Sequence, residues 1–216
     1  VYTLSKTSFS CANLGENTVT LTVRDAAGNQ STCNATVTVQ DNSIPVLTGK
    51  ATTNTSNVNA DAGLCYYIIK GSEFDPTPTD NCSVASMSYT VTGATTLSGT
   101  GSLSGKQLNQ GANVISWTAQ DASGNVSNLF SFTKTVVDNQ APAITLAGNQ
   151  FRGTTSGCNY TVVGTEFDPV VADNCISGTV TVEYKINAGV WTAGTSVAGL
   201  SLPKGINTIL WRTSDG

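Results

Sequence analysis

The chain has 216 residues, of which only 11% are charged, against roughly a quarter in an average soluble domain. It contains 33 Thr, 22 Ser and 21 Gly but no His, and its net charge is −4. The net negative charge excludes the basic surface of a nucleic-acid-binding protein. No apolar run is long enough for direct membrane insertion. Without His, the commonest general base in enzymes is missing. Thr suits strands and Gly with Asn suits turns, so the composition predicts an all-β protein.

The first predicted elements are two strands joined by a hairpin loop. Val19, Leu21 and Val23 alternate with Thr, which is the pattern of a strand with one face turned to a core. The segment Asp25-Ala-Ala-Gly-Asn29 follows, with Gly-Asn at the positions of a tight turn that need a positive φ. A linker of about four residues then leads to Pro45, and because Pro fixes φ, we expect a stiff junction and a rod of domains.

Further strands are predicted wherever apolar residues recur at every second position. These positions are expected to face the core, and Trp117 and Trp211 are expected there rather than on a ligand platform. They are Tyr67 and Ile69; Met87, Tyr89 and Val91; Ile115, Trp117 and Ala119; Tyr160 and Val162; Val180, Val182 and Tyr184; and Ile209, Trp211 and Thr213.

Self-comparison shows that the chain is a repeat with a period near 95 residues. Residues 65–82 (CYYIIKGSEFDPTPTDNC) match 158–175 (CNYTVVGTEFDPVVADNC) without a gap, and the block at 14–25 recurs at 109–121 and 203–215. Such a period fits an immunoglobulin-sized sandwich. We therefore expect residues 1–41 to be the C-terminal part of one repeat, 42–138 a complete repeat, and 139–216 a repeat without its last strand.

The six cysteines predict disulfides and an oxidising, secreted location. Six cysteines allow 15 connectivities, but a spacing of 17 residues occurs twice and favours Cys65–Cys82 and Cys158–Cys175, which leaves Cys11–Cys33. Metal ligation is the alternative, although no CxxC or Cys/His cluster supports it. The chain begins in strand-like sequence, so we expect a mature form or an excised piece of a longer array.

The motifs "GLC…FDPTPTDNC", "L-x-x-G-x-N-x-I-x-W" and "QDASGN…VVDNQAP" resemble the HYR-like, immunoglobulin-type repeats of secreted Bacteroidetes surface proteins, such as the giant cell-surface adhesins used in gliding motility. The resemblance covers nearly all of residues 12–216. It implies tandem β-sandwich domains, attachment to the outer membrane of a Gram-negative cell, and a role in adhesion. One departure is Cys33, which has no counterpart in the second copy.

Acidic residues concentrate in the recurring motifs and predict calcium sites at the junctions. In an immunoglobulin-like sandwich the loops with these motifs lie at the end that meets the preceding domain. Calcium prefers carboxylate, amide and carbonyl oxygens, so each group is a hypothetical metal site. The first group is Asp41, Asn42, Glu73, Asp75, Asp80 and Asp121; the second is Asp138, Asn139, Glu166, Asp168, Asp173 and Asp215. The alternative is that these residues only form Asx-turns and cap loops.

These features predict a non-enzymatic stalk rather than a catalyst. The paired carboxylates Glu73/Asp75 and Glu166/Asp168 match the requirement of glycoside hydrolysis, but they occur in tandem, and an active site occurs once. We expect a stalk segment whose partners are the neighbouring repeats, with an adhesive tip elsewhere that contacts a surface or a glycan. The alternative is a spacer or carbohydrate-binding module of a secreted hydrolase, for which Tyr66, Phe151 and Trp191 are the unassigned aromatics.

Overall fold

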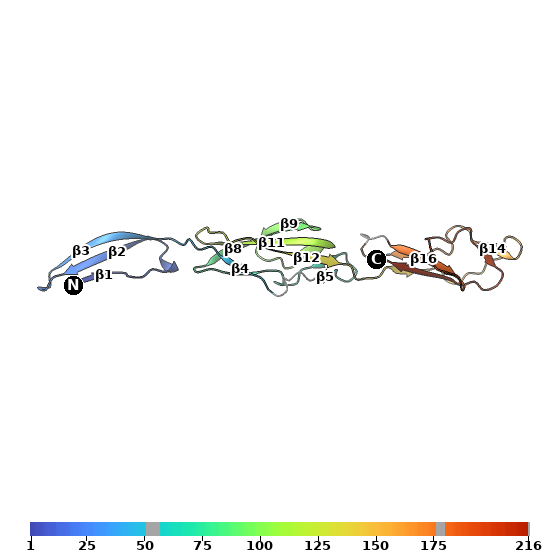
Figure 1. Ribbon diagram of the computed structural model, residues 1–216, viewed down its shortest axis with the longest axis horizontal. Helices are drawn as coiled ribbons and strands as arrows, with labels where there is room; N and C mark the ends of the chain where they lie inside the picture. The colour runs from blue at the N-terminus through green and yellow to red at the C-terminus, as the bar shows by residue number, and fades with distance from the viewer. Residues whose placement is uncertain (51–56, 176–179, 216) are drawn as a thin grey trace. The chain divides into compact units, whose positions relative to one another are not determined.

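The computed structural model describes residues 1–50, 57–175 and 180–215, and in these residues the regular structure is β-strand apart from one short 3-10 helix. The chain is therefore all-β, with tandem immunoglobulin-like domains, which confirms the predicted fold class (Figure 1). It divides into two compact units, one of residues 1–58 and 68–136 and the other of residues 59–67 and 137–216.

The first unit opens with an antiparallel sheet of order β1-β2-β3, made of β1 (Tyr2–Leu4), β2 (Gly15–Arg24) and β3 (Gln30–Val39). The β2–β3 ladder runs from Gly15↔Val39 to Arg24↔Gln30, so the predicted hairpin loop is confirmed. The Asp25 carboxylate closes that loop by accepting the Asn29 backbone N–H (2.8 Å) and side-chain amide (2.9 Å). A 3-10 helix, η1 (Cys11–Asn13), precedes β2. Val19 is buried as predicted, whereas Val23 is 48% exposed.

After this sheet the chain forms a five-stranded sheet of order β5-β12-β11-β8-β9 and the two-stranded sheets β4-β7 and β10-β6. The bounds are β4 (Val46–Thr48), β5 (Val58–Asn59), β6 (Tyr66–Ile68), β7 (Thr77–Thr79), β8 (Val84–Gly93), β9 (Leu97–Thr100), β10 (Gln107–Asn109), β11 (Gly111–Asp121) and β12 (Phe130–Val137). This arrangement of a large sheet with smaller ones provides the two layers that a sandwich core needs.

The core of this unit lies on one face of β11, as its alternation predicts. Ile115, Trp117 and Ala119 are at most 2% exposed. On β8 the directly paired residues are Val91 and Tyr89, which are also buried, and the Tyr89 and Trp117 rings meet edge to face at 5.3 Å. Such an aromatic pair stabilises by about 1 kcal/mol beyond the area it buries. The prediction that Trp117 belongs to the core is confirmed.

The recurring Gly-x-Asn motif has a structural role that explains its presence in three copies. The buried Asn113 side-chain amide donates to the Asn109 and Gly111 carbonyls, each at 3.0 Å. Asn17 and Asn207 make the same pair of bonds to the carbonyls four and two residues before them. The motif therefore bends the chain into the start of each long strand, with the backbone carbonyls satisfied locally.

The second unit contains smaller sheets of order β13-β15, β14-β18 and β17-β16-β19. The bounds are β13 (Ala143–Thr145), β14 (Asn159–Thr161), β15 (Val170–Ala172), β16 (Thr181–Ile186), β17 (Thr192–Ala193), β18 (Ser201–Pro203) and β19 (Ile209–Ser214). Its core consists of Val162, Val197 and Leu202, against which Tyr184 and Trp211 pack while half-buried. The predicted core position of Val162 is thus confirmed, and Tyr184 and Trp211 contact the core although each is only half-buried.

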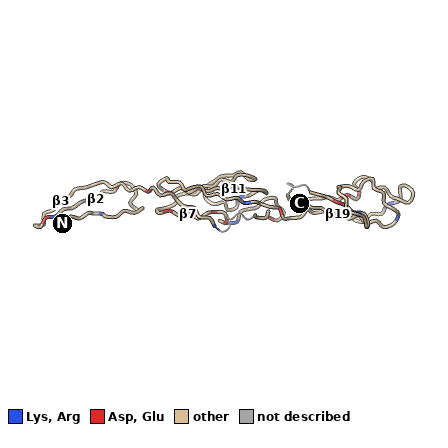
Figure 2. Tube along the Cα trace, in the orientation of Figure 1, with Lys and Arg blue, Asp and Glu red and all other residues tan. Residues whose placement is uncertain are grey.

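Charged residues are sparse along both units, and most of the trace in Figure 2 belongs to uncharged residues. In the described ranges no helix has the length and apolar character needed to cross a membrane.

Candidate functional site

The disulfides join cysteines that are far apart in the sequence. Cys11 pairs with Cys82, with Cα atoms 5.3 Å apart, and Cys65 pairs with Cys175 at 4.8 Å. The predicted pairs Cys65–Cys82, Cys158–Cys175 and Cys11–Cys33 are therefore wrong. The repeated spacing of 17 residues has another cause, which is that each repeat carries the same two cysteines. The second cysteine of each repeat bonds to a cysteine earlier in the chain, Cys82 to Cys11 across 71 residues and Cys175 to Cys65 across 110 residues.

Cys33 and Cys158 are free and exposed in the described structure. Cys33 lies on β3 opposite Leu21. Cys158 immediately precedes β14, as Cys65 precedes β6 in the other copy of the motif.

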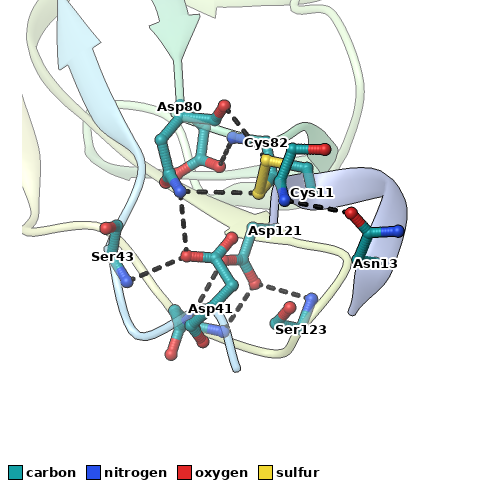
Figure 3. Close-up of a disulfide and its surroundings, with 11 residues drawn as sticks. Cys11, Asn13, Asp41, Ser43, Asp80, Cys82, Asp121 and Ser123 are labelled. Carbon is teal, nitrogen blue, oxygen red and sulfur yellow. Dashed lines mark hydrogen bonds between the residues drawn. A yellow bond between two sulfur atoms is a disulfide. The ribbon is translucent and has the colours of Figure 1, made fainter. Parts of the chain in front are cut away.

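The first candidate cation site lies beside the Cys11–Cys82 disulfide and consists of three aspartates (Figure 3). Asp41 follows β3, Asp80 follows β7, and Asp121 is the last residue of β11. One carboxylate oxygen from each lies within 4.8 Å of the others, and Asp121 is only 3% exposed. Each pair of charges at this distance repels by roughly 1 kcal/mol in water, and by more where burial reduces screening.

Hydrogen bonds keep Asp121 ionised in spite of its burial. Desolvation raises the pKa of this carboxyl, but the Asn125 side chain (2.7 Å), the Asn125 backbone N–H (2.8 Å) and the Ser123 N–H (2.9 Å) outweigh it, so the pKa lies below its ordinary value. Protonation of Asp121 therefore does not relieve the repulsion within the cluster at neutral pH.

Two asparagines connect the loops of this cluster. The Asn125 amide also donates to the Asp41 backbone carbonyl at 2.9 Å, and the Asn81 amide donates to Asp41 Oδ1 at 3.2 Å. Asp41 Oδ1 additionally accepts the Ser43 N–H at 3.1 Å. Asn81 and Asn125 were not among the predicted ligands, although both belong to the recurring Asp-Asn-Cys and Gly-Asn motifs that could have indicated them.

The second candidate site lies in the other unit and repeats the first. Asp138, Asp173 and Asp215 follow β12, β15 and β19, and their carboxylate oxygens also lie within 4.8 Å of one another. Asp138 Oδ1 accepts the Gln140 N–H at 3.0 Å. Both clusters thus take one aspartate from each of the three recurring motifs.

In each cluster one oxygen of the Asp-Asn-Cys aspartate has no hydrogen-bond partner in the described part of the chain. Asp80 Oδ1 accepts the Cys82 N–H at 2.9 Å, and Asp173 Oδ1 accepts the Cys175 N–H at 2.7 Å. Among the residues that the structure describes, none donates a hydrogen bond to the Oδ2 atom of either aspartate, and both Oδ2 atoms are inaccessible to solvent. A buried carboxylate oxygen without a donor is costly, and its recurrence in two independent copies favours a ligand over an accident of packing.

The structure does not bring the Glu-Phe-Asp acids into these clusters. Asp75 accepts the Ser102 hydroxyl at 2.6 Å and the Leu103 N–H at 3.1 Å, and Asp168 accepts the Val197 N–H at 2.9 Å. The physical reason is a short strand: β7 separates Asp75 from Asp80, and β15 separates Asp168 from Asp173. Three extended residues span roughly 10 Å, so the two acids of each motif lie at opposite ends of a strand.

Both glutamates of this motif also act locally. Glu73 accepts the Lys70 N–H at 2.6 Å, and its charge partly offsets the burial that lowers the pKa of Lys134. Glu166 accepts the Tyr160 hydroxyl, the Val163 N–H (3.0 Å) and Arg152 Nε (2.8 Å), which together hold its pKa down to about 2. Glu73, Asp75, Glu166 and Asp168 thus accept hydrogen bonds from nearby loops, as expected if these acids cap loops and do not bind a metal.

Asn42 and Asn139, the two remaining predicted ligands, have exposed side chains next to the first aspartate of each cluster.

Of the unassigned aromatics, Trp191 immediately precedes β17 and contacts two cations of the β17-β16-β19 sheet. Arg212 lies over its ring at 4.3 Å and Lys185 at 5.1 Å. Such contacts stabilise by about 0.5–1 kcal/mol at a partly exposed site. Phe151, by contrast, is 96% exposed.

No protein-family model matches the chain, and no curated protein sequence matches it. Among solved structures it is similar to protocadherin gamma B7 extracellular cadherin domains 1-4 (TM-score 0.35, 13% identity) and to the protocadherin gamma B7 EC3-6 cis-dimer (TM-score 0.37, 13% identity). The similarity covers 100% of this chain but only 66% and 63% of theirs, so the chain spans less than two thirds of those proteins.

Proposed function

We propose that the chain is a stalk segment of a repetitive cell-surface adhesin and that each three-aspartate cluster binds one calcium ion. The observation that carries the metal part is the duplicated cluster, with a solvent-inaccessible, unpartnered Oδ2 on Asp80 and on Asp173. That oxygen could coordinate a divalent cation, and the attraction of the three carboxylates to the cation would offset the repulsion among them.

The donor set favours calcium over a transition metal. All the clustered groups are carboxylates, and the chain has no His. Hard oxygen ligands select calcium or magnesium, and calcium accepts six to eight of them in flexible geometry, with water and backbone carbonyls completing the set. Affinity in the roughly millimolar range, as in other extracellular modules, is expected.

The stalk part of the proposal rests on the tandem fold and the repeated motifs. The repeats are residues 1–41, 42–138 and 139–216, and the resemblance to HYR-like repeats of Bacteroidetes surface proteins supports a secreted, outer-membrane-attached adhesin, with gliding motility as its context. The partners are neighbouring repeats, while a tip elsewhere in the protein contacts the surface or a glycan.

Calorimetric melting of the chain with EGTA and with 10 mM CaCl₂ tests the metal sites. At about ten times Kd, binding stabilises by about 1.4 kcal/mol per site, which raises Tm by about 5 to 8 °C for units of this size. The rise should disappear in the double variant Asp80→Asn/Asp173→Asn and persist in Glu16→Gln, which removes a carboxylate outside the clusters. An equal rise in all three proteins, or none in the wild type, would refute calcium binding at these aspartates.

Protease treatment of intact producing cells, followed by mass spectrometry of the released peptides, tests the location. Peptides from residues 1–216 should be released without lysis. Their recovery only after lysis would contradict a surface stalk.

A further inference from the structure

Each candidate cation site shares its Asp-Asn-Cys loop with a disulfide. In the first site, residues 80–82 provide a ligand carboxylate, an amide that bonds to Asp41, and a half-cystine, in three consecutive positions. The Asp80 carboxylate is oriented by the Cys82 N–H at 2.9 Å, so the position of its unpartnered Oδ2 depends on the backbone of the bonded cysteine.

The other half of the disulfide is attached to the segment that carries Asp41. Cys11 begins η1, which leads directly into β2, and Gly15 at the start of β2 pairs with Val39 at the end of β3. Cys11 and Asp41 therefore lie at the same end of this hairpin. The Cys11–Cys82 bond consequently fixes the Asp80 loop relative to Asp41, against the repulsion between the two carboxylates.

The second site has the same construction. The Cys175 N–H orients Asp173 at 2.7 Å, and Cys175 bonds to Cys65. The loop that precedes Cys65 is held near Asp138, because Gln140, whose N–H bonds to Asp138, accepts the Gly63 N–H at 2.7 Å. In both copies, a cysteine on the side of the first aspartate (Asp41 or Asp138) is thus bonded to the Asp-Asn-Cys loop that carries the second aspartate (Asp80 or Asp173).

From this arrangement we propose that disulfide and cation are thermodynamically coupled, so that reduction of the Cys11–Cys82 bond weakens cation binding at Asp41, Asp80 and Asp121. The proposal rests on calcium binding at these clusters. Coupling is reciprocal, so the bound cation protects the disulfide from reduction to the same extent. Cys11 is exposed, whereas Cys175 is only 3% exposed, so a mild reductant acts on the first site before the second.

Isothermal titration with CaCl₂ tests the coupling on the full 216-residue chain in a Cys33→Ser/Cys158→Ser background, which removes the free thiols and prevents exchange. The oxidised protein should bind two ions. A further Cys11→Ser/Cys82→Ser change should weaken one of them roughly tenfold, within the usual range of coupling between sites, and leave the other unchanged. Two ions bound with unaltered affinities would overturn the coupling while the calcium sites stand; no binding to the oxidised protein would remove both proposals.

A redox equilibrium covers the case in which the serine variant does not fold. The oxidised fraction of the Cys11–Cys82 bond at equilibrium with a buffer of reduced and oxidised dithiothreitol, measured by alkylation and mass spectrometry, should shift in saturating CaCl₂ so that the equilibrium constant for reduction falls roughly tenfold. The matched variant Asp80→Asn keeps the disulfide but loses the ligand, so its equilibrium constant should not respond to calcium. Equal equilibrium constants with and without calcium in the parent protein would overturn the coupling.

Discussion

Removal of the Cys11–Cys82 disulfide provides a quantitative test of the observed pairing. The bond joins residues 71 positions apart within one compact unit. In the chain-entropy model, closing a loop of that length in the unfolded state stabilises the folded unit by about 4 kcal/mol at 25 °C. The double variant Cys11→Ala/Cys82→Ala should therefore lose about 4 kcal/mol of unfolding free energy, a large share of the total for an ordinary domain.

Urea denaturation followed by tryptophan fluorescence, to which the buried Trp117 contributes from this unit, measures this loss. Cys33→Ala and Cys158→Ala are the controls, and because both thiols are free and exposed, each variant should remain within about 0.5 kcal/mol of the wild type. A non-reducing peptide map should join the Cys11 peptide to the Cys82 peptide. A loss of several kcal/mol in Cys33→Ala, or a Cys65–Cys82 peptide in the map, would refute the pairing and the reasoning built on it.

Three further variants test local features. Glu166 has a pKa of about 2 against an ordinary 4.5, so its stabilising effect is present above pH 4.5 and is lost as the pH falls towards 2. The Tm difference between wild type and Glu166→Gln should therefore shrink between pH 4.5 and pH 2. A difference that stays constant over this interval would contradict the hydrogen bonds assigned to the Glu166 carboxylate. Gly93→Ala should destabilise, because φ is +101° and the new Cβ would lie 2.4 Å from the Ala112 carbonyl, whereas Gly101→Ala meets no atom within 4 Å and should cost less in the same urea titration. Asn113→Ala leaves the Asn109 and Gly111 carbonyls without their buried donor and should cost about 2 kcal/mol, while an unchanged denaturation midpoint would show that the motif is dispensable.

Elements with a local cause could be predicted from the sequence. The alternation around Trp117 identifies the core face of β11, because burial on one face of a strand imposes a period of two on the chain itself. The Asp25–Asn29 loop follows from turn chemistry within five residues. The three aspartates of each cation cluster were among the predicted ligands, since a recurring motif and the general topology of a sandwich suffice to place them at one end.

The features that depend on distant segments could not be derived in this way. The spacing of Cys65 and Cys82 is equally compatible with a bond between them and with one bond from each to another partner; only the tertiary structure distinguishes these cases. Asp75 was assigned to the wrong end because residues 77–79, with a central Pro, do not resemble a strand, yet they pair with β4. The corresponding Val170-Val171-Ala172 is strand-like and was the available signal for that separation.

The loops closed by the two disulfides overlap, since residues 65–82 lie inside both. If the chain is pulled from its ends, the shortest covalent path runs through residues 1–11, crosses to Cys82, returns backwards to Cys65, crosses to Cys175 and continues to residue 216. That path contains about a third of the residues, so full extension is limited to roughly 250 Å instead of roughly 750 Å. Even after every strand has separated, residues 12–64 and 83–174 lie outside this path and carry no force. Because the two loops overlap, the path crosses residues 65–82 from the C-terminal end of that segment to its N-terminal end, so this segment is stretched in the opposite chain direction to the others.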